Sequence, residues 1–393
     1  GNIYFAGTFA ETLSVDGNTV VSEGNTDFYV AKMSPEGSVL WLKSGGSNAV
    51  EQANAIAVDA DGNVYVAGLS NDNTAFDGNR FPSLGSKDGF LLKLDNNGNM
   101  LYVRTLGCVN DDNAYDVVVD GSNNVIVTGY FNYALQISST SMFQNARGAN
   151  DAFLVKFDSE GNVLWSMTNA SSSHDYGRRV TCDNAGNVYL AAEFKGAISM
   201  GGSNLQSPND INVYLAKFDS SGTVQWAVQR GASGNDSIRA LGVTSAGDAY
   251  MAYKQTNSNP FIAKFSSSGV SQGTIAFSGT GTLEVGDILC DQNGNTYVAG
   301  GYSGTIEFGS EASTSSGSGR DFYIIRYGSD GNVNMRIFGN QNNTNYINSI
   351  AIDYANNLVA GGGFASSITM NADTETSNGQ DDALIIKFER YMS

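Results

Sequence analysis

The chain has 393 residues, a mass of 41.5 kDa and a formal net charge of −18, with a sequence pI of about 4.3. Hydrophobic residues make up 41% of it and aromatic residues 11%, which is enough to build a large core and argues against a disordered chain. The acidity argues against a nucleic acid partner, because nucleic acid binding needs a positive footprint, and no apolar run is long enough to predict insertion into a membrane.

A repeat of about 60 residues organises the chain from its first residue. The segment 62–68, Gly-Asn-Val-Tyr-Val-Ala-Gly, recurs with small changes at 186–191 and 294–300. Repeats begin near residues 1, 62, 123, 186, 247, 294 and 356. These copies leave no room for a separate domain, so we predict that residues 1–393 form a single domain.

Each repeat contains four segments that predict strands. They are an apolar run ending in Asp (55–59), the Gly-Asn-x-Tyr segment (62–68), a segment with Asp or Asn five residues before a basic residue (88–93), and a segment that often ends in Trp (163–165). Their β-branched and aromatic content, bounded by Gly, Asn and Asp, is typical of strands. The Asp-x-x-Gly sequences between strands, as at 59–62 and 95–98, predict tight turns in which Asp caps the turn and Gly takes a positive φ.

Four antiparallel strands repeated in this way predict an all-β, seven-bladed β-propeller with four-stranded blades. The chain begins at a second strand and stops after a third strand. We therefore expect the first and last blades to be incomplete, or the natural protein to extend beyond residues 1 and 393. A parallel β-helix and a continuous solenoid of hairpins are the alternatives.

The repeat pattern resembles that of the bacterial SBBP family of seven-bladed propeller repeats. The resemblance rests on apolar-Asp-x-x-Gly-Asn-x-Tyr-x-x-Gly followed by Gly-x-x-Asp-x-Phe-x-x-Lys-x-Asp-x-x-Gly-x-x-x-Trp, and it is strongest at residues 1–235 and 285–330. It implies a propeller fold and a secreted or cell-surface location. It implies no catalytic activity, because the family offers no shared site to transfer.

The loops after the second strands are long, and loop-rich faces carry binding more often than faces made of tight turns. Apolar elements within these loops, such as Ile198-Ser199-Met200 and Ile306-Glu307-Phe308, recur in most repeats and therefore predict packing. Aromatic residues outside the repeat pattern are the predicted ligand contacts, because exposed rings stack on sugars or anchor partner proteins. These residues are Tyr133, Phe143, Tyr176, Tyr302 and Tyr346.

The sequence offers little support for a catalytic histidine or a calcium site. The only histidine, His174, lies between a serine and an aspartate in one polar loop, whereas a catalytic triad needs a base held by a distant partner. The Asp-x-x-Gly turns lack the late acidic ligand of a calcium loop. The basic residues of the third strands are expected to pair with the aspartates that end the first strands, and the recurring Trp residues and the isolated Cys182 and Cys290 are expected to be core residues. We predict no catalytic residue, metal site or cofactor.

The sequence therefore predicts a non-enzymatic, secreted or cell-surface protein that binds a protein or polysaccharide through its long-loop face. One alternative is a structural subunit of a surface adhesin or of a secretion or motility assembly, with a partner at the chain termini. Another is a polysaccharide-active enzyme, which would need paired carboxylates at its axis.

Overall fold

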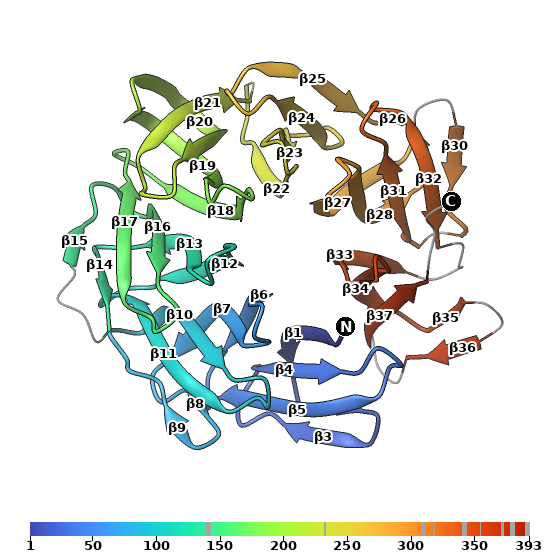
Figure 1. The fold of residues 1–393 in the computed structure, drawn as a ribbon, viewed down its shortest axis with the longest axis horizontal. Helices are drawn as coiled ribbons and strands as arrows, with labels where there is room; N and C mark the ends of the chain where they lie inside the picture. The colour runs from blue at the N-terminus through green and yellow to red at the C-terminus, as the bar shows by residue number, and fades with distance from the viewer. Residues whose placement is uncertain are drawn as a thin grey trace. The chain divides into compact units, whose positions relative to one another are not determined.

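The computed structural model describes residues 1–138, 143–231, 233–308, 311–317, 319–339, 344–353, 355–370, 373–377 and 382–389. The chain folds as two compact units, Gly1–Arg230 (unit 1) and Gly231–Ser393 (unit 2). Every regular element among the described residues is a β-strand, and the named strand pairs are antiparallel (Figure 1). The described residues include no helix with the length and apolar character of a membrane span.

Unit 1 contains four main sheets, one for each successive repeat. The first has the order β1 (Ile3–Phe9), β4 (Asp27–Met33), β5 (Val39–Gly46), β8 (Ala75–Phe76) and β9 (Asn79–Arg80). The second has the order β15 (Phe143–Asn145), β14 (Ala134–Ile137), β11 (Met100–Gly107), β10 (Lys87–Leu94), β7 (Val64–Asn71) and β6 (Gln52–Val58). The third consists of β12 (Asn113–Val119), β13 (Val125–Phe131), β16 (Asp151–Phe157) and β17 (Val163–Asn169). The fourth consists of β18 (Asp175–Cys182), β19 (Val188–Met200), β20 (Ser203–Phe218) and β21 (Val224–Arg230), and β2 (Thr12–Val15) and β3 (Asn18–Val21) form a separate hairpin.

Unit 2 contains three main sheets. The first consists of β22 (Ser237–Val243), β23 (Ala249–Lys254), β24 (Phe261–Phe265) and β25 (Ser271–Ala276). The second consists of β27 (Thr282–Cys290), β28 (Thr296–Ser303), β31 (Asp321–Tyr327) and β32 (Val333–Phe338), and the third of β33 (Asn345–Ile352), β34 (Leu358–Phe364) and β37 (Asp382–Phe388). Small sheets join β26 (Ser278–Gly279), β29 (Thr305–Phe308) and β30 (Glu311–Thr314), and join β35 (Ser367–Met370) to β36 (Asp373–Thr376).

The core of unit 1 lies between neighbouring sheets, because the middle strands are buried on both faces. On β13, Val127 belongs to the core shared with the second sheet, whereas the next residue back, Ile126, packs in the core shared with the fourth. Successive side chains of a strand point to opposite faces, so an uninterrupted apolar run such as 125–127 fills two cores at once. The first strands β6, β12 and β18 contact one another along one edge of the unit (Figure 1).

The predicted packing role of the apolar elements in the long loops is confirmed. These elements are hairpins. Two of them bond to the outer strand of the preceding sheet, β8 to β5 and β14 to β11, whereas β29 pairs with the short strand β26, which follows β25 in the chain. Ile198, Ile306, Phe308 and Ile368 are all buried. A hairpin therefore ties one repeat to the one before it.

The turn chemistry predicted from Asp-x-x-Gly is also present. Asp59 Oδ1 accepts the backbone N–H groups of Asp61 (3.0 Å) and Asn63 (2.8 Å), and Gly62 has a φ of +81°. Asp59 Oδ2 accepts the side-chain amide of Asn63 (2.8 Å) and the hydroxyl of Tyr65 (3.2 Å). The Asp59 carboxylate thus accepts four hydrogen bonds, which fix the conformation of the turn and of the start of the following strand.

Each first strand of the second to seventh repeats also carries a β-bulge, which the sequence analysis did not predict. One residue of the strand is left without a partner in the register, and a bulge re-aims the side chain it carries. The residues at the bulges are Asn54, Tyr115 and Arg178 in unit 1 and Arg239, Gly286 and Asn348 in unit 2.

The antiparallel pairing shows that the parallel β-helix alternative is wrong. In the described part of the chain, the parallel contacts are isolated bridges outside the named strands, such as the one between Asn150 and His174.

Candidate functional site

The connections that follow the second and fourth strands lie at one end of unit 1, which we call the long-loop end. A row of hydrogen-bonded polar side chains crosses this end. Asn110 Nδ2 donates to Asn132 Oδ1 (3.0 Å), Asn132 Nδ2 donates to Asn150 Oδ1 (2.9 Å), and Asn150 Nδ2 donates to the hydroxyl of Tyr176 (3.1 Å). We call Asn110, Asn132, Asn150 and Tyr176 the asparagine–tyrosine row. The four residues come from three connections and from the start of β18, so the packing of successive sheets brings them together. Each amide donates one of its two hydrogens within the row.

Three tyrosines and one arginine form a cluster at the Tyr176 end of the row. The Tyr130 ring lies 5.6 Å from that of Tyr115 and 5.3 Å from that of Tyr176, the latter edge to face. The guanidinium of Arg178 lies 4.6 Å from the ring centres of both Tyr115 and Tyr176. We call Tyr115, Tyr130, Tyr176 and Arg178 the tyrosine–arginine cluster. The exposed His174 stacks on Tyr176, with 6.3 Å between ring centres.

The bulges of β12 and β18 supply two members of this cluster. Tyr115 and Arg178 occupy the bulge positions of adjacent first strands. Arg178 also donates to Glu193 (2.8 Å), whose carboxylate is buried on β19. Burial acts to lower the pKa of Arg178, but Glu193 and Tyr115 raise it overall, so the guanidinium stays charged and fixed. Burial is the main cause that raises the pKa of Tyr130 to about 12, so its hydroxyl stays protonated.

Exposed apolar groups flank the row. Tyr133 is 61% exposed and Val109 is 58% exposed, and each follows or precedes a row residue in the chain. Tyr133 also has a φ of +76°, a conformation that costs a residue with a side chain about 1–2 kcal/mol. A strained backbone that presents an exposed ring is a common feature of binding sites.

The five predicted ligand contacts are divided between unit 1 and unit 2. Tyr176 is a member of the row and Tyr133 follows its member Asn132 in the chain, although Tyr176 lies in strand β18 instead of a loop. The side chain of Phe143 lies outside the described residues. Tyr346 is a half-buried residue of β33 in unit 2.

The prediction that Tyr302 is an exposed loop residue was wrong. It lies in β28, is 1% exposed and packs with Phe308, Tyr323 and Phe338. Its hydroxyl hydrogen-bonds to Ser313 (2.8 Å). This ring is part of the core, so it cannot meet a ligand at the surface.

Pairs of acidic side chains lie beneath the long-loop end, one pair at each junction between consecutive sheets of unit 1. The members of each pair are 24 residues apart in the chain and no more than 1% exposed: Asp27 and Glu51, Asp88 and Asp112, Asp151 and Asp175. A backbone bond between sheets sets each pair, as where Asp112 N–H donates to Lys87 O (2.9 Å). The sequence analysis noted the first member of each pair and missed the second.

These carboxylates hold the backbone that carries the row. Asp112 accepts the N–H groups of Cys108 (2.6 Å) and Asn132 (2.7 Å). Burial is the main cause that raises the pKa of Asp112 to about 8 and that of Asp175 to about 6, and the neighbouring Asp88 and Asp151 raise them further. Asp175 accepts hydrogen bonds from the backbone N–H groups of Ser171 and Lys195.

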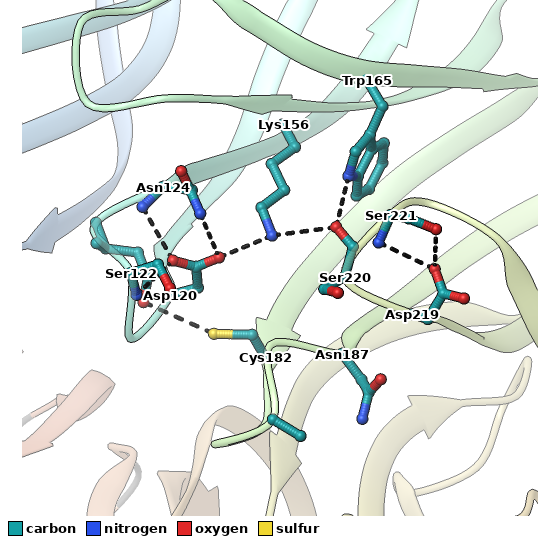
Figure 2. A network of polar contacts seen from close by, with 12 residues as sticks. Asp120, Ser122, Asn124, Lys156, Trp165, Cys182, Asn187, Asp219, Ser220 and Ser221 are labelled. Carbon is teal, nitrogen blue, oxygen red and sulfur yellow. Dashed lines mark hydrogen bonds and ion pairs between the residues drawn. The ribbon is translucent and has the colours of Figure 1, made fainter.

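The opposite, tight-turn end of unit 1 is held by a repeated contact between sheets (Figure 2). The carbonyl of Ser220 accepts both Lys156 Nζ (3.5 Å) and the indole N–H of Trp165 (3.1 Å) from the preceding sheet. In the first pair of sheets, Asn96 O accepts Lys32 and Trp41 in the same way. These tryptophans therefore pack against the next turn as well as contributing to the core.

The predicted pairing of third-strand lysines with first-strand aspartates is confirmed in three repeats. The distances are 2.7 Å for Lys156–Asp120, 3.8 Å for Lys217–Asp183 and 3.8 Å for Lys387–Asp353. Burial acts to raise the pKa of Asp120, but Lys156 and Asn124 lower it overall. In the first two repeats the lysine instead bonds to a turn carbonyl of the next sheet, as Lys93 does with Ser159 (2.8 Å).

An open groove of about 600 Å³ lies beside this contact, lined by Lys156, Leu164, Trp165 and the turns at 120–124 and 184–186. Its charged groups, Lys156 and Asp120, are bonded to each other and are 3% exposed. Its lining residues therefore offer no unpaired charged side chain to a ligand, and we favour the long-loop end as the binding site.

No cluster of three or more His, Cys, Asp or Glu side chains placed to hold a metal ion occurs in the described ranges. The three cysteines are free thiols, and Cys182 Sγ lies 3.7 Å from the carbonyl of Val119. Burial is the main cause that raises the pKa of Cys182 to about 11, which keeps the thiol protonated and unreactive at neutral pH.

Comparison with protein families identifies the repeat. The family model described as SBBP, a β-propeller repeat, matches residues 45–73, which include the whole of β6 and β7. Residues 45–73 are an SBBP β-propeller repeat. The resemblance predicted from the sequence is therefore confirmed for this segment.

Two relatives are each 25% identical to part of the chain. Regulatory protein FlaEY of Caulobacter vibrioides aligns over 197 residues, which is 48% of this chain and 20% of that protein. WD repeat-containing protein L264 of Acanthamoeba polyphaga mimivirus aligns over 244 residues, 52% of this chain and 17% of that protein. The chain thus spans about a fifth of the length of these relatives.

Solved structures resemble the chain distantly. A protein from Bacteroides caccae is 10% identical with a TM-score of 0.42, and the match covers 79% of this chain and 89% of that one. A gluconolactonase from Xanthomonas campestris is 10% identical with a TM-score of 0.39, covering 81% of this chain and 86% of that one.

Proposed function

We propose that this chain is a non-enzymatic β-propeller that binds an extended polysaccharide at its long-loop end, through the asparagine–tyrosine row and the tyrosine–arginine cluster. The observation that carries the proposal is the row itself, in which three amides and a phenol are bonded in sequence; the exposed Tyr133 follows Asn132 in the chain, and Tyr176 belongs to both the row and the cluster. Amides offer both donors and acceptors to sugar hydroxyls, and aromatic rings pack against the apolar faces of sugars.

The charge of the surroundings favours a sugar polymer of low charge. Arg178 is neutralised by Glu193, and Lys87 lies 3.3 Å from Asp111 near the other end of the row. With a net charge of −18, the chain as a whole repels polyanions. Glycans without strong acidic groups, presented as chains long enough to cross several sheets, fit these properties.

In the same proposal, the seven repeats form one seven-bladed propeller with four-stranded blades, of which the first and last are incomplete. The match to an SBBP repeat and the four and three main sheets of the two units support this. The protein acts outside the cell or on its surface, a location suggested by the SBBP resemblance. It uses no cofactor, and chain-terminal contacts with an assembly partner are the alternative role.

A glycan array probed with the whole chain tests the proposal. Tyr133→Ala and Tyr176→Ala should each weaken binding to any glycan hit at least tenfold, which is about 1.4 kcal/mol. Leu164→Ala is the matched control, because Leu164 is 52% exposed but lies at the tight-turn end. It should leave the affinity unchanged.

Three results would overturn the proposal. Equal losses in all three variants would show that the row is not the contact surface. Absence of glycan binding, together with a stoichiometric protein crosslinked at the termini, would favour the assembly subunit. Release of new reducing ends from a bound polysaccharide would show an enzyme.

A further inference from the structure

Beneath the row, the Asp88–Asp112 pair contains a buried carboxylate oxygen that lacks a hydrogen-bond donor. Asp88 Oδ2 accepts the backbone N–H groups of Leu84 (2.9 Å) and Gly85 (3.2 Å). Its other oxygen, Oδ1, is buried, and no donor among the described residues bonds to it. A buried carboxylate oxygen without a donor costs about 1–3 kcal/mol, so a hydrogen at this position would stabilise the fold.

An equivalent junction in unit 2 shows how such an oxygen is satisfied. There the pair is Asp321 and Asn345, again 24 residues apart, and Asn345 replaces the second acid. Asn345 N–H donates to Arg320 O (2.7 Å), as Asp112 N–H does to Lys87 O. The side-chain amide of Asn345 then donates to Asp321 Oδ1 at 3.5 Å. The amide supplies the hydrogen that two ionised carboxylates lack.

Cations do not replace that hydrogen at the Asp88–Asp112 pair. The charged groups that act on the two carboxyls are Asp72 and Asp111, which are both acidic. Lys87, the nearest base in the chain, lies against Asp111 at 3.3 Å. Full ionisation would therefore place two interacting negative charges in a buried site.

We propose that Asp88 and Asp112 share one proton, and that this proton holds the asparagine–tyrosine row in the arrangement seen here. The link is direct, because Asp112 accepts the N–H groups of Cys108 and Asn132, on either side of the long-loop end. Loss of the proton leaves a buried pair of charges, which is relieved when the connection at 108–112 moves outward and admits water. Asn132 then loses its backbone anchor and the row loses its second member.

The same arrangement recurs at the other end of the row. Asp151 and Asp175 follow the pattern, with Asp175 N–H donating to Asn150 O (2.8 Å) and Tyr176 next in the chain. Here the basic residue Arg147 acts on Asp151, so this pair tolerates ionisation better than the first. Burial raises the pKa of Asp88 and of Asp175 to about 6 and that of Asp112 to about 8, so the Asp112 proton is released last.

Hydrogen exchange of the free, full-length chain at pH 6 and pH 9 tests the proposal. After correction for the intrinsic rate, the protection of the Asn132 amide should fall at least tenfold at pH 9, while a core amide such as Val127 on β13 stays protected. In Asp88→Asn the new amide can donate to Asp112 at every pH, the reverse of the Asn345–Asp321 bond, so the fall should disappear. Glu36→Gln removes one exposed acid and should behave like the wild-type chain.

Unchanged protection of Asn132 in the wild-type chain, or an equal fall in Asp88→Asn, would overturn the proposal. A parallel loss at Val127 would also overturn it, since the proton would then control global stability and not the row. This regulation presupposes the function proposed above, because it acts on the same row. No glycan enters the experiment, so its result is separate from that of the array.

Discussion

The contact between a tryptophan and the next glycine turn allows a quantitative test of how the sheets of unit 1 are joined. Gly222 has a φ of +87°, and a Cβ at this position would lie 2.8 Å from Trp165 Cδ2. Gly37 occupies the equivalent turn of the first sheet with a φ of +95°, and nothing lies within 4 Å of its Cβ position. The two glycines thus have the same backbone conformation, but only Gly222 has a tryptophan ring against its Cβ position.

Replacing each glycine by alanine separates the two effects. The left-handed conformation costs alanine about 1–2 kcal/mol in either variant. In Gly222→Ala the new methyl group must also displace the Trp165 ring, and overpacking of this kind costs about 1–3 kcal/mol more. We therefore expect Gly37→Ala to lose about 1–2 kcal/mol and Gly222→Ala about 2–5 kcal/mol of the free energy of unfolding.

Urea unfolding followed by tryptophan fluorescence measures both losses in the same unit. The excess cost of Gly222→Ala should vanish when Trp165 is replaced by alanine, because the double variant removes the clash. Equal losses in the two single variants would refute the reasoning, and so would an excess that persists without Trp165. Either result would mean that the turn tolerates the methyl group and that the indole does not lock the sheets.

The remaining predictions concern buried polar groups. Lys156→Met should cost about 3–5 kcal/mol in urea unfolding, because it leaves Asp120 buried and unpaired, whereas Lys87→Met at an exposed pair should cost less than about 1 kcal/mol. Because the pKa of Asp120 is lowered in the fold, this pair adds stability above the ordinary aspartate range and loses it as the pH falls through the lowered value; Lys156→Met should therefore flatten the acid limb of a stability–pH curve, and an unchanged limb would contradict the pairing. Tyr302→Phe should lose about 1 kcal/mol with its bond to Ser313 and leave glycan binding unaltered; weakened binding would show that Tyr302 contributes to binding despite its burial.

The strands, the turns and the packing role of the long-loop hairpins could be predicted from the sequence because they depend on neighbouring residues. Alternating or continuous apolar segments specify a strand, and Asp59 finds its donors within six residues of itself. Repetition strengthened each inference, since an error in one copy is corrected by the others. The resemblance to SBBP repeats followed from the same local patterns.

The candidate site could be predicted only in part. Tyr133 and Tyr176 were found because they depart from the repeat pattern, but the same signal selected Tyr302, which the core absorbs. Tyr115 and Arg178 were missed because nothing in their sequence marks a bulge: an extra residue in a strand is revealed by the register with its partner.

The sequence by itself determined the all-β class, the length of the repeat and the chemistry of each turn, since these depend on contacts between residues close in the chain. The tertiary structure alone decided which polar groups meet. The interval of 24 residues between Asp88 and Asp112 is visible in the sequence, but it has no meaning until consecutive sheets pack and a backbone bond joins Asp112 to Lys87, the residue before Asp88. The row above them depends on the same long-range packing, because its hydrogen bonds join residues 18 to 26 positions apart in the chain.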